Sequence, residues 1–314
     1  MAELRRGRRG GRGRPLNGVD ARGPGTGLNR WARRAALLSI LLAACPAVLR
    51  AADAPPASPD EAQVDLSAHF PGIDRDDATF VVSHPASGRV IRHNPRRAGQ
   101  RFLPASTFKI ANSLIALDTG VATGADHAMR WDPALQPAEG FWAADWSKDH
   151  TLRSAMRSSV FWFHQALARG IGPERMQAHL DRFAYGNRDM GGGADRFWLH
   201  GALRISPDEQ VRFLERMYHG RLGVSDAVTR TVRDLLVLED APGWRISGKT
   251  GTADVTATRE MAWLVGYVER DGDTWFYALN LEGEPVWEQW GPPGRRLDLV
   301  RGLLRALAVL PGPD

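Results

Sequence analysis

Two pairs of strand-like segments, one toward each end of the chain, constrain the fold most. Each pair consists of two runs rich in β-branched and aromatic residues around a Gly-containing turn: Thr79–Val82 with Arg89–Arg92, and Met261–Val268 with Thr274–Leu279. Runs of this kind predict antiparallel hairpins. Both ends of the chain are therefore expected to contribute strands to one antiparallel sheet.

Helical patterns fill the interval between the hairpins and also follow the second one. They cover Ser106–Leu117, Leu152–Leu167 and Pro207–Tyr218, the last directly after the capping-like Ser206. The helical spacing of apolar residues from 297 to 307 predicts a C-terminal helix. This order of elements predicts an α+β fold, in which an antiparallel sheet is flanked by N- and C-terminal helices and carries an inserted all-helical lobe.

The positive charge of the chain is concentrated at its start. Residues 1–50 hold eleven arginines against two acidic residues, so that segment carries +9 and the remainder −4 of the total of +5. No basic surface for nucleic acid is therefore predicted in the folded part. The first 52 residues are predicted to be an Arg-rich leader and signal peptide, residues 53–64 a linker, and residues 65–310 the catalytic domain.

A ten-residue apolar stretch over 35–44 follows Arg33 and Arg34. It has the length of a signal-peptide core and is too short to span a bilayer comfortably. Two processing sites remain open, a lipobox that ends at Cys45 or ordinary cleavage near Ala51 or Ala52. Cys45 is the only cysteine, so no disulfide can form within the chain. The predicted location is the periplasm, with a membrane contact only through the signal or a lipid on Cys45.

A serine and a lysine stand three residues apart where a predicted helix begins. Ser106 and Lys109 fall on one face of that helix, which brings a hydroxyl beside an amine. A serine needs an adjacent proton acceptor to become a nucleophile, and a lysine can accept a proton only when it is neutral. The apolar neighbours Phe108 and Ile110 favour neutrality, so the pair predicts a serine nucleophile with a lysine base.

A second motif supports this interpretation 140 residues downstream. Lys249, Thr250 and Gly251 follow a β-compatible run, and on a sheet edge they would offer a cation, a hydroxyl and close backbone approach to a bound carboxylate. The combination of the two motifs is typical of penicillin-recognising serine enzymes.

Within that superfamily the sequence resembles the class D, or oxacillinase-type, β-lactamases from about residue 80 to residue 307. The motifs that carry the resemblance stand in family order: Ser106–Lys109, Tyr185–Asn187, Phe197–Leu199 followed by Ile205–Pro207, and Lys249–Gly251. The resemblance implies hydrolysis of penicillins, oxacillin-like ones included, through a Ser106 acyl-enzyme. It also implies that CO2 carboxylates Lys109, that Trp198 hydrogen-bonds the carbamate, and that no other cofactor is needed.

One motif departs from the family pattern Ser-x-Val. Ser158 and Val160 match its letters, but the flanking segments align without a gap only if Ser159 is the serine that relays protons and Phe161 replaces the valine. A gap within a helix would rotate all later residues by about 100°. The gap-free register therefore predicts Ser159 as relay and Phe161 as the wall of the lysine pocket, where its bulk would slow deacylation.

The resemblance further implies a carboxylate-binding arginine before the C-terminal helix, and spacing favours Arg296 over Arg295. It places the oxyanion-hole donors on the backbone of Ser106 and Thr252. Histidine spacing shows no zinc motif, so no metal is predicted. Two alternatives are a sensor that acylates without turnover and a cell-wall transpeptidase or carboxypeptidase. The partner predicted is a β-lactam, and the protein is expected as a monomer or homodimer.

Overall fold

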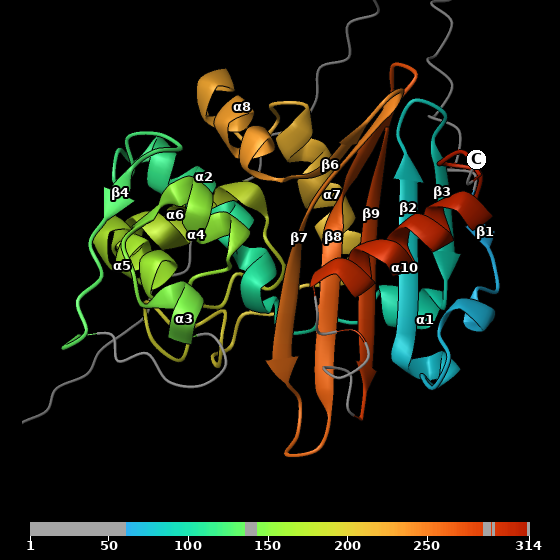
Figure 1. Cartoon of the computed structure of the whole chain (residues 1–314), viewed down its shortest axis with the longest axis horizontal. Helices are drawn as coiled ribbons and strands as arrows, with labels where there is room; N and C mark the ends of the chain where they lie inside the picture. The colour runs from blue at the N-terminus through green and yellow to red at the C-terminus, as the bar shows by residue number, and fades with distance from the viewer. Residues whose placement is uncertain (1–60, 136–142, 285–289, 291–292, 313–314) are drawn as a thin grey trace, which may run out of the picture. The chain divides into compact units, whose positions relative to one another are not determined.

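A seven-stranded sheet forms the centre of the fold (Figure 1). The computed structural model describes residues 61–135, 143–284, 290 and 293–312. Neighbouring strands are antiparallel except for the first pair, and the strand order is β1-β3-β2-β9-β8-β7-β6. The strands are β1 (Glu61–Gln63), β2 (Ala78–His84), β3 (Arg89–His93), β6 (Val237–Ala241), β7 (Trp244–Asp254), β8 (Glu260–Arg270) and β9 (Asp273–Gly283).

Both predicted hairpins are confirmed, as β2–β3 and β8–β9, and β2 pairs with β9 to join the two ends of the chain in one sheet. The α+β class is confirmed as well. The predicted linker extends too far, because β1 (Glu61–Gln63) already pairs in parallel with β3. The leader over 1–52, with Cys45, lies outside the described residues.

The helix α10 (Pro293–Ala306) crosses one face of the sheet (Figure 1). Its buried residues Leu299, Val300, Leu303 and Leu304 form an apolar cluster with strand residues such as Leu264. The 3₁₀ turn η1 (Ser67–His69) contacts the same helix. Full burial of one such side chain stabilises a fold by roughly 2 kcal/mol. This cluster therefore stabilises the packing of α10 on the sheet.

The other face of the sheet packs on α7 (Pro207–Tyr218), whose bounds agree with the prediction. Ser206 caps this helix: its hydroxyl accepts from the Glu209 N–H and the Glu209 carboxylate accepts from the Ser206 N–H. Such a reciprocal pair satisfies two backbone donors that the first turn leaves free. The cap fixes the start of α7 and the direction in which the chain enters it.

The helical lobe lies beside the β7 edge of the sheet in Figure 1. Its elements are η3 (Ala105–Phe108), α2 (Lys109–Asp118), α3 (Ala143–Trp146), α4 (Leu152–Arg157), α5 (Phe161–Ile171), α6 (Pro173–Phe183), α8 (Asp226–Leu235) and the small strands β4 (Ala128–Met129) and β5 (His150–Thr151). The short helix α1 (Pro95–Ala98) lies away from the lobe and packs against β2, β3 and α7. The lobe and the sheet share one apolar cluster, so the two layers form a single core.

The prediction of one helix over Leu152–Leu167 is wrong. The chain forms two helices, α4 and α5, with a break at Ser158–Val160. Ser159 has a φ of 54°, a left-handed conformation that no helix interior accepts. Within the described residues no helix is long and apolar enough to cross a membrane.

Candidate active site

Ser106 and Lys109 lie at the junction between η3 and α2, on the side of the lobe that faces β7. The Lys109 Nζ is 2.8 Å from the Ser106 Oγ, and the lysine side chain is completely buried. The residue before the serine, Ala105, has a φ of 48°, and its N–H donates to the Trp198 carbonyl at 3.1 Å. A strained turn held by such a contact is typical of reactive sites. The structure brings the predicted nucleophile and base into hydrogen-bond contact.

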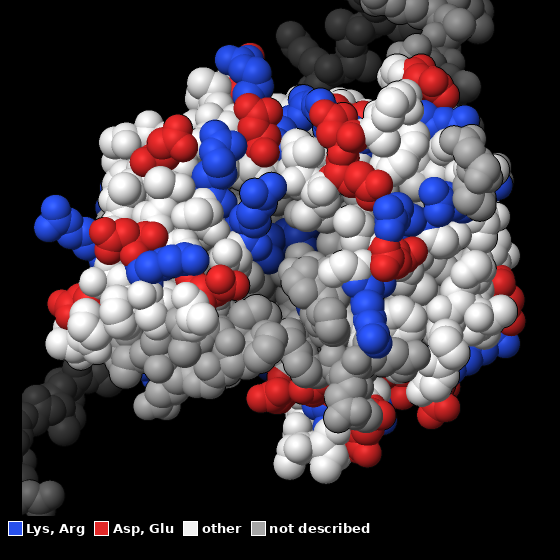
Figure 2. Space-filling view, viewed as in Figure 1, with Lys and Arg blue, Asp and Glu red and all other residues white. Residues whose placement is uncertain are grey.

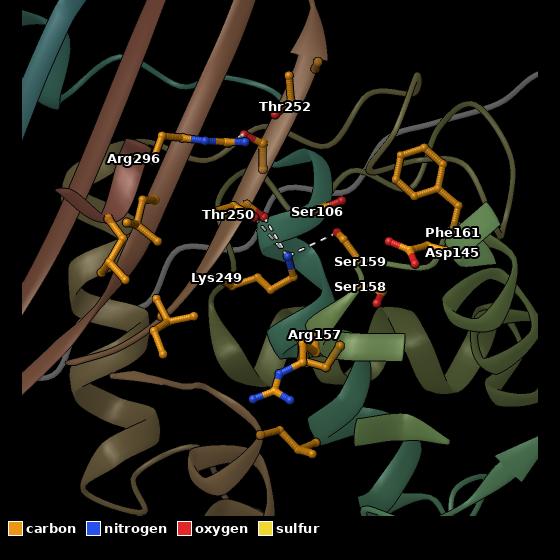
Figure 3. A pocket seen from close by; sticks show the side chains of 18 of the residues that line it. Ser106, Asp145, Arg157, Ser158, Ser159, Phe161, Lys249, Thr250, Thr252 and Arg296 are labelled. Atoms are coloured by element: carbon orange, nitrogen blue, oxygen red, sulfur yellow. Dashed lines mark hydrogen bonds between the residues drawn. The ribbon is translucent and has the colours of Figure 1, made fainter. Parts of the chain in front are cut away.

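Ser159 comes to the same point from the break between α4 and α5. Lys109 Nζ donates to the Ser159 carbonyl at 2.6 Å and to its hydroxyl at 2.9 Å. The hydroxyl of Ser159 also accepts from Lys249 Nζ at 3.1 Å, as Figure 3 shows. Ser158 is placed differently, since its carbonyl accepts from the indole of Trp146. Ser159 is thus the serine whose hydroxyl joins both lysines.

Phe161 begins α5 next to Lys109. The centre of its ring is 4.5 Å from the Lys109 Nζ and 4.6 Å from the ring centre of Trp146. Val160 has its side chain fully buried in the apolar core. The aromatic ring therefore forms the wall of the lysine pocket, and its negative face attracts the charged form of the amine.

Both lysines of the site have pKa values below that of an ordinary lysine. Burial holds the pKa of Lys109 well below its usual value, and the charge of Lys249 lowers it further. Burial and, second, the charge of Arg296 lower the pKa of Lys249 to about 7. No acidic side chain contacts either amine among the hydrogen bonds and ion pairs of the described chain. The site therefore favours a neutral Lys109, the form that can accept a proton.

The Lys249–Thr252 segment lies on β7 beyond the part that pairs with β6, so at these positions β7 forms the edge of the sheet, the setting considered for them from the sequence. The pairing stops at Ser247, and the residues beyond it face η3. Lys249 Nζ is 3.3 Å from the Thr250 hydroxyl. A side chain on Gly251 would meet the Pro104 carbonyl and the Thr107 side chain, each at 3.1 Å. The glycine therefore serves the close packing of η3 against β7.

Arg296 reaches the site from α10 and is almost completely buried. Its guanidinium donates to the Gly251 carbonyl at 2.7 Å and to the Trp263 carbonyl at 3.1 Å. Burial lowers the pKa of Arg296 to about 10, so the group still carries its charge at neutral pH. Two backbone carbonyls hold this cation in a fixed orientation beside β7.

Trp198 lies behind the nucleophile rather than in the open cleft. Its ring packs on Phe108 with centres 5.1 Å apart, and its indole Nε1 is buried without a hydrogen-bond acceptor in the part of the chain that the structure describes. An unsatisfied buried donor costs about 1–3 kcal/mol. Such a donor is suited to an acceptor that the chain itself does not provide.

A cleft of about 940 Å³ lies between the lobe and the sheet. Ser106, Ser159, Phe161, Lys249, Thr250, Gly251, Thr252 and Arg296 all contribute to its walls. In the space-filling view, the surface is hollowed between the two layers and blue basic atoms border the hollow (Figure 2). Among the described residues no group of His, Cys, Asp and Glu is arranged to hold a metal ion.

The sequence missed Gln210, a buried residue of α7 that supports the nucleophile's turn. Its Nε2 donates to the Thr107 hydroxyl at 2.8 Å, and that hydroxyl donates to the Pro104 carbonyl at 2.7 Å. The signal was present, because Gln210 is a polar residue on the otherwise apolar face that includes Leu214 and Met217. A buried polar residue at a core position usually has a specific partner.

Comparison with known proteins adds an independent line of evidence. A family model for the penicillin binding protein transpeptidase domain matches residues 78–292. Beta-lactamase OXA-48 of Klebsiella pneumoniae is 43% identical over 190 residues, which are 60% of this chain and 69% of that protein. The regulatory protein BlaR1 of Bacillus licheniformis is 37% identical over 205 residues, which are 65% of this chain but 33% of that protein.

Solved structures agree with the sequence relatives. A class D β-lactamase, YbXI from Nostoc, matches with a TM-score of 0.71 at 35% identity and covers 79% of this chain and all of its own. The C-terminal domain of the Bacillus licheniformis BlaR penicillin receptor also has a TM-score of 0.71, at 31% identity, with 80% of this chain and 98% of that domain covered. The fold, the order of the motifs, the sequence relatives and the solved structures all indicate the same family. The chain belongs to the class D β-lactamase family of the penicillin-recognising serine enzymes.

Proposed function

We propose that this protein hydrolyses β-lactams, penicillins and oxacillin-like ones among them, through an acyl-enzyme on Ser106. The observation that carries the proposal is the 2.8 Å contact between the Ser106 hydroxyl and a buried Lys109 amine whose pKa is depressed. A hydroxyl in contact with a neutral base can be deprotonated as it attacks. The β-lactamase names of the relatives point to the same substrate class.

In the first half of the reaction, the Ser106 oxygen bonds to the lactam carbonyl carbon and the carbon–nitrogen bond of the ring breaks. The proton of Ser106 passes to the Lys109 base, and Ser159 returns a proton to the leaving nitrogen. Ser159 is suited to this relay because its hydroxyl contacts both amines, at 2.9 and 3.1 Å. In the second half, water attacks the ester carbon and Lys109 takes its proton, which then passes to the Ser106 oxygen as the bond between that oxygen and the acyl carbon breaks.

Charge on the substrate is stabilised from the β7 side. The backbone N–H groups of Ser106 and Thr252 are proposed as the oxyanion hole, and both residues line the cleft. The ring carboxylate is proposed to bind near Arg296 and Thr250. The fixed orientation of the Arg296 guanidinium supports this role, because little conformational freedom is lost when a carboxylate binds to it.

We further propose that Lys109 works in its carboxylated form. CO2 adds only to a neutral amine, which the depressed pKa of Lys109 provides. The buried indole N–H of Trp198, which lacks an acceptor among the described residues, is the donor expected for the added oxygens. When present, the group supplies a carboxylate base next to Ser106. No cofactor other than CO2 or bicarbonate enters the proposal.

A receptor that acylates but turns over slowly is the second candidate. It is favoured by the likeness to the BlaR penicillin receptor and by the bulk of Phe161 next to Lys109. Both candidates require Ser106 to be labelled by penicillin, and they differ only in the second step.

The deciding experiment is multiple-turnover hydrolysis of a chromogenic cephalosporin, combined with mass spectrometry of penicillin-labelled peptide. The wild type is expected to show many turnovers and label on Ser106, and Ser106→Ala neither. Ser158→Ala is the matched control, because this neighbouring serine also lines the cleft and should keep activity. Label without repeated turnover would establish the receptor-like candidate, and label on another serine would refute the nucleophile.

A further inference from the structure

An arginine that the proposed reaction does not use projects into the cleft beside the relay serine. Arg157 ends α4, is solvent-exposed, and lines the same cleft as Lys249 and Arg296. It makes no hydrogen bond or ion pair with any residue that the structure describes. Arg153, one turn earlier on the same face, pairs with Asp126 at 3.6 Å. Arg157 is therefore a cation in the cleft with no internal counter-ion.

Arg157 is open to an acidic group from outside. Buried Lys249 and Arg296 lie along the same cleft. Four carboxylates also line the cleft, those of Asp145, Asp234, Asp254 and Glu260, but none of them forms an ion pair with Arg157 in the described part of the chain. Because Arg153 is already paired with Asp126, Arg157 is the arginine on this face of α4 that lacks a carboxylate partner among the described residues. An acidic group bound there adds a charge-assisted hydrogen bond.

The position of Arg157 selects a particular part of a β-lactam. Figure 3 shows Arg296 and Arg157 on opposite sides of Lys249, with the Arg157 guanidinium pointing away from Ser106. Arg157 is two residues before Ser159, the hydroxyl proposed to protonate the leaving nitrogen. The fused ring, which carries that nitrogen, extends on this side, whereas its own carboxylate is directed to Arg296. A substituent on the fused ring that points away from the reacting carbonyl therefore reaches Arg157.

We propose that Arg157 forms a subsite for a second acidic group, carried by the fused-ring side of the β-lactam. The subsite rests on the proposed function for the orientation of the substrate. It makes the protein discriminate between dianionic and monoanionic β-lactams of the same core. The discrimination is coulombic and partly solvent-exposed, so it is expected to weaken as salt is added.

Two cephalosporins with the same acylamino side chain test the proposal. Ceftriaxone carries an acidic triazine on the substituent of its fused ring, and cefotaxime carries a neutral acetoxy group there. Their dissociation constants are measured by titration calorimetry in a Ser106→Ala background, so that no covalent step interferes. Arg157→Gln is expected to weaken ceftriaxone binding roughly five-fold, the scale of one exposed ion pair, and to leave cefotaxime binding unchanged.

The controls separate a local contact from general charge. Arg153→Gln removes the same charge from the same helix face. It should change the ratio of the two dissociation constants by less than half the change that Arg157→Gln causes. The effect of Arg157→Gln should disappear in 0.5 M salt, which is about three times the ionic strength of a physiological buffer. Equal losses for both cephalosporins, or equal effects of the two arginine variants, would overturn the subsite. Failure of the proposed hydrolysis is seen separately, as absent turnover in the enzyme with Ser106 intact.

Discussion

The replacement Phe161→Val tests whether the aromatic ring beside Lys109 slows deacylation more than acylation. The ring centre lies 4.5 Å from the Lys109 Nζ and stabilises the charged amine, whereas burial opposes that charge. A desolvated cation–π contact contributes about 1–2 kcal/mol, and one pKa unit corresponds to about 1.4 kcal/mol. Removing the ring should therefore lower the pKa of Lys109 further.

Two consequences follow for the rate. On the acid limb of the pH–rate profile, a lower pKa raises the neutral fraction of Lys109. The smaller side chain also opens space on the order of one water molecule, about 30 Å³, beside the base. Because Lys109 is the proposed base of both steps, the larger neutral fraction favours both, and the added space for water favours the second step in particular. We expect the deacylation rate to rise about ten-fold, which corresponds to a barrier lower by ~1.4 kcal/mol.

Stopped-flow hydrolysis of a chromogenic cephalosporin separates the two steps. The wild type should show a burst equivalent to one acyl group per enzyme, followed by slow turnover, and Phe161→Val should show a smaller burst and faster turnover. Val160→Ala is the matched control: this buried residue should cost about 2 kcal/mol of stability but leave deacylation nearly unchanged. If Val160 proves the sensitive position and Phe161 nearly neutral, Ser158 rather than Ser159 is the relay and the reasoning fails.

Three further outcomes are expected. Trp198→Phe should reduce the carbamate signal of Lys109 in ¹³C NMR and make activity dependent on added bicarbonate; an unchanged signal would remove the indole from the proposal. Because folded Lys249, with a pKa of about 7, has released a proton that the unfolded chain still holds, this residue should contribute about 2 kcal/mol to the rise in the free energy of unfolding between pH 7 and 9, and urea titrations should find the rise smaller by that amount in Lys249→Met. Mass spectrometry of periplasmic and membrane fractions should find a mature chain that starts at lipid-bearing Cys45 or near Ala52, and active protein that retains the Arg-rich leader would argue against export.

Local sequence signals predicted those parts of the fold in which local and tertiary preferences agree. The two hairpins and α7 agree with prediction because turn residues and a capping serine act within a few positions of the chain. The break at Ser158–Val160 was missed, since apolar residues continue through it at helical spacing. Ser159 adopts its left-handed conformation where its carbonyl and hydroxyl meet Lys109, a contact between residues 50 apart.

The break also removes the argument by which the sequence favoured Ser159. Ser159 was preferred to Ser158 because a gap within a continuous helix would rotate all later residues, but no helix is continuous there. The structure nevertheless puts the Ser159 hydroxyl between the two lysines. Gln210 did carry a local signal, as a polar residue on an apolar helix face, but nothing near it or near Arg157 in the sequence indicates the turn that one supports or the cleft that the other enters.

Gly251 has no side chain, and the close packing that this permits limits which substitutions the protein can accept there. The η3 turn that carries Ser106 rests directly on the β7 backbone, with the Pro104 carbonyl 3.1 Å from where a Cβ would stand. A side chain there would force the η3 turn to move by a few tenths of an ångström, which would change the position of Ser106 relative to a carbonyl bound along β7. Substitution at this position therefore disturbs Ser106 before it can reshape the cleft. Adaptation must act on the rims of the cleft, where positions such as Arg157 can vary without moving the nucleophile.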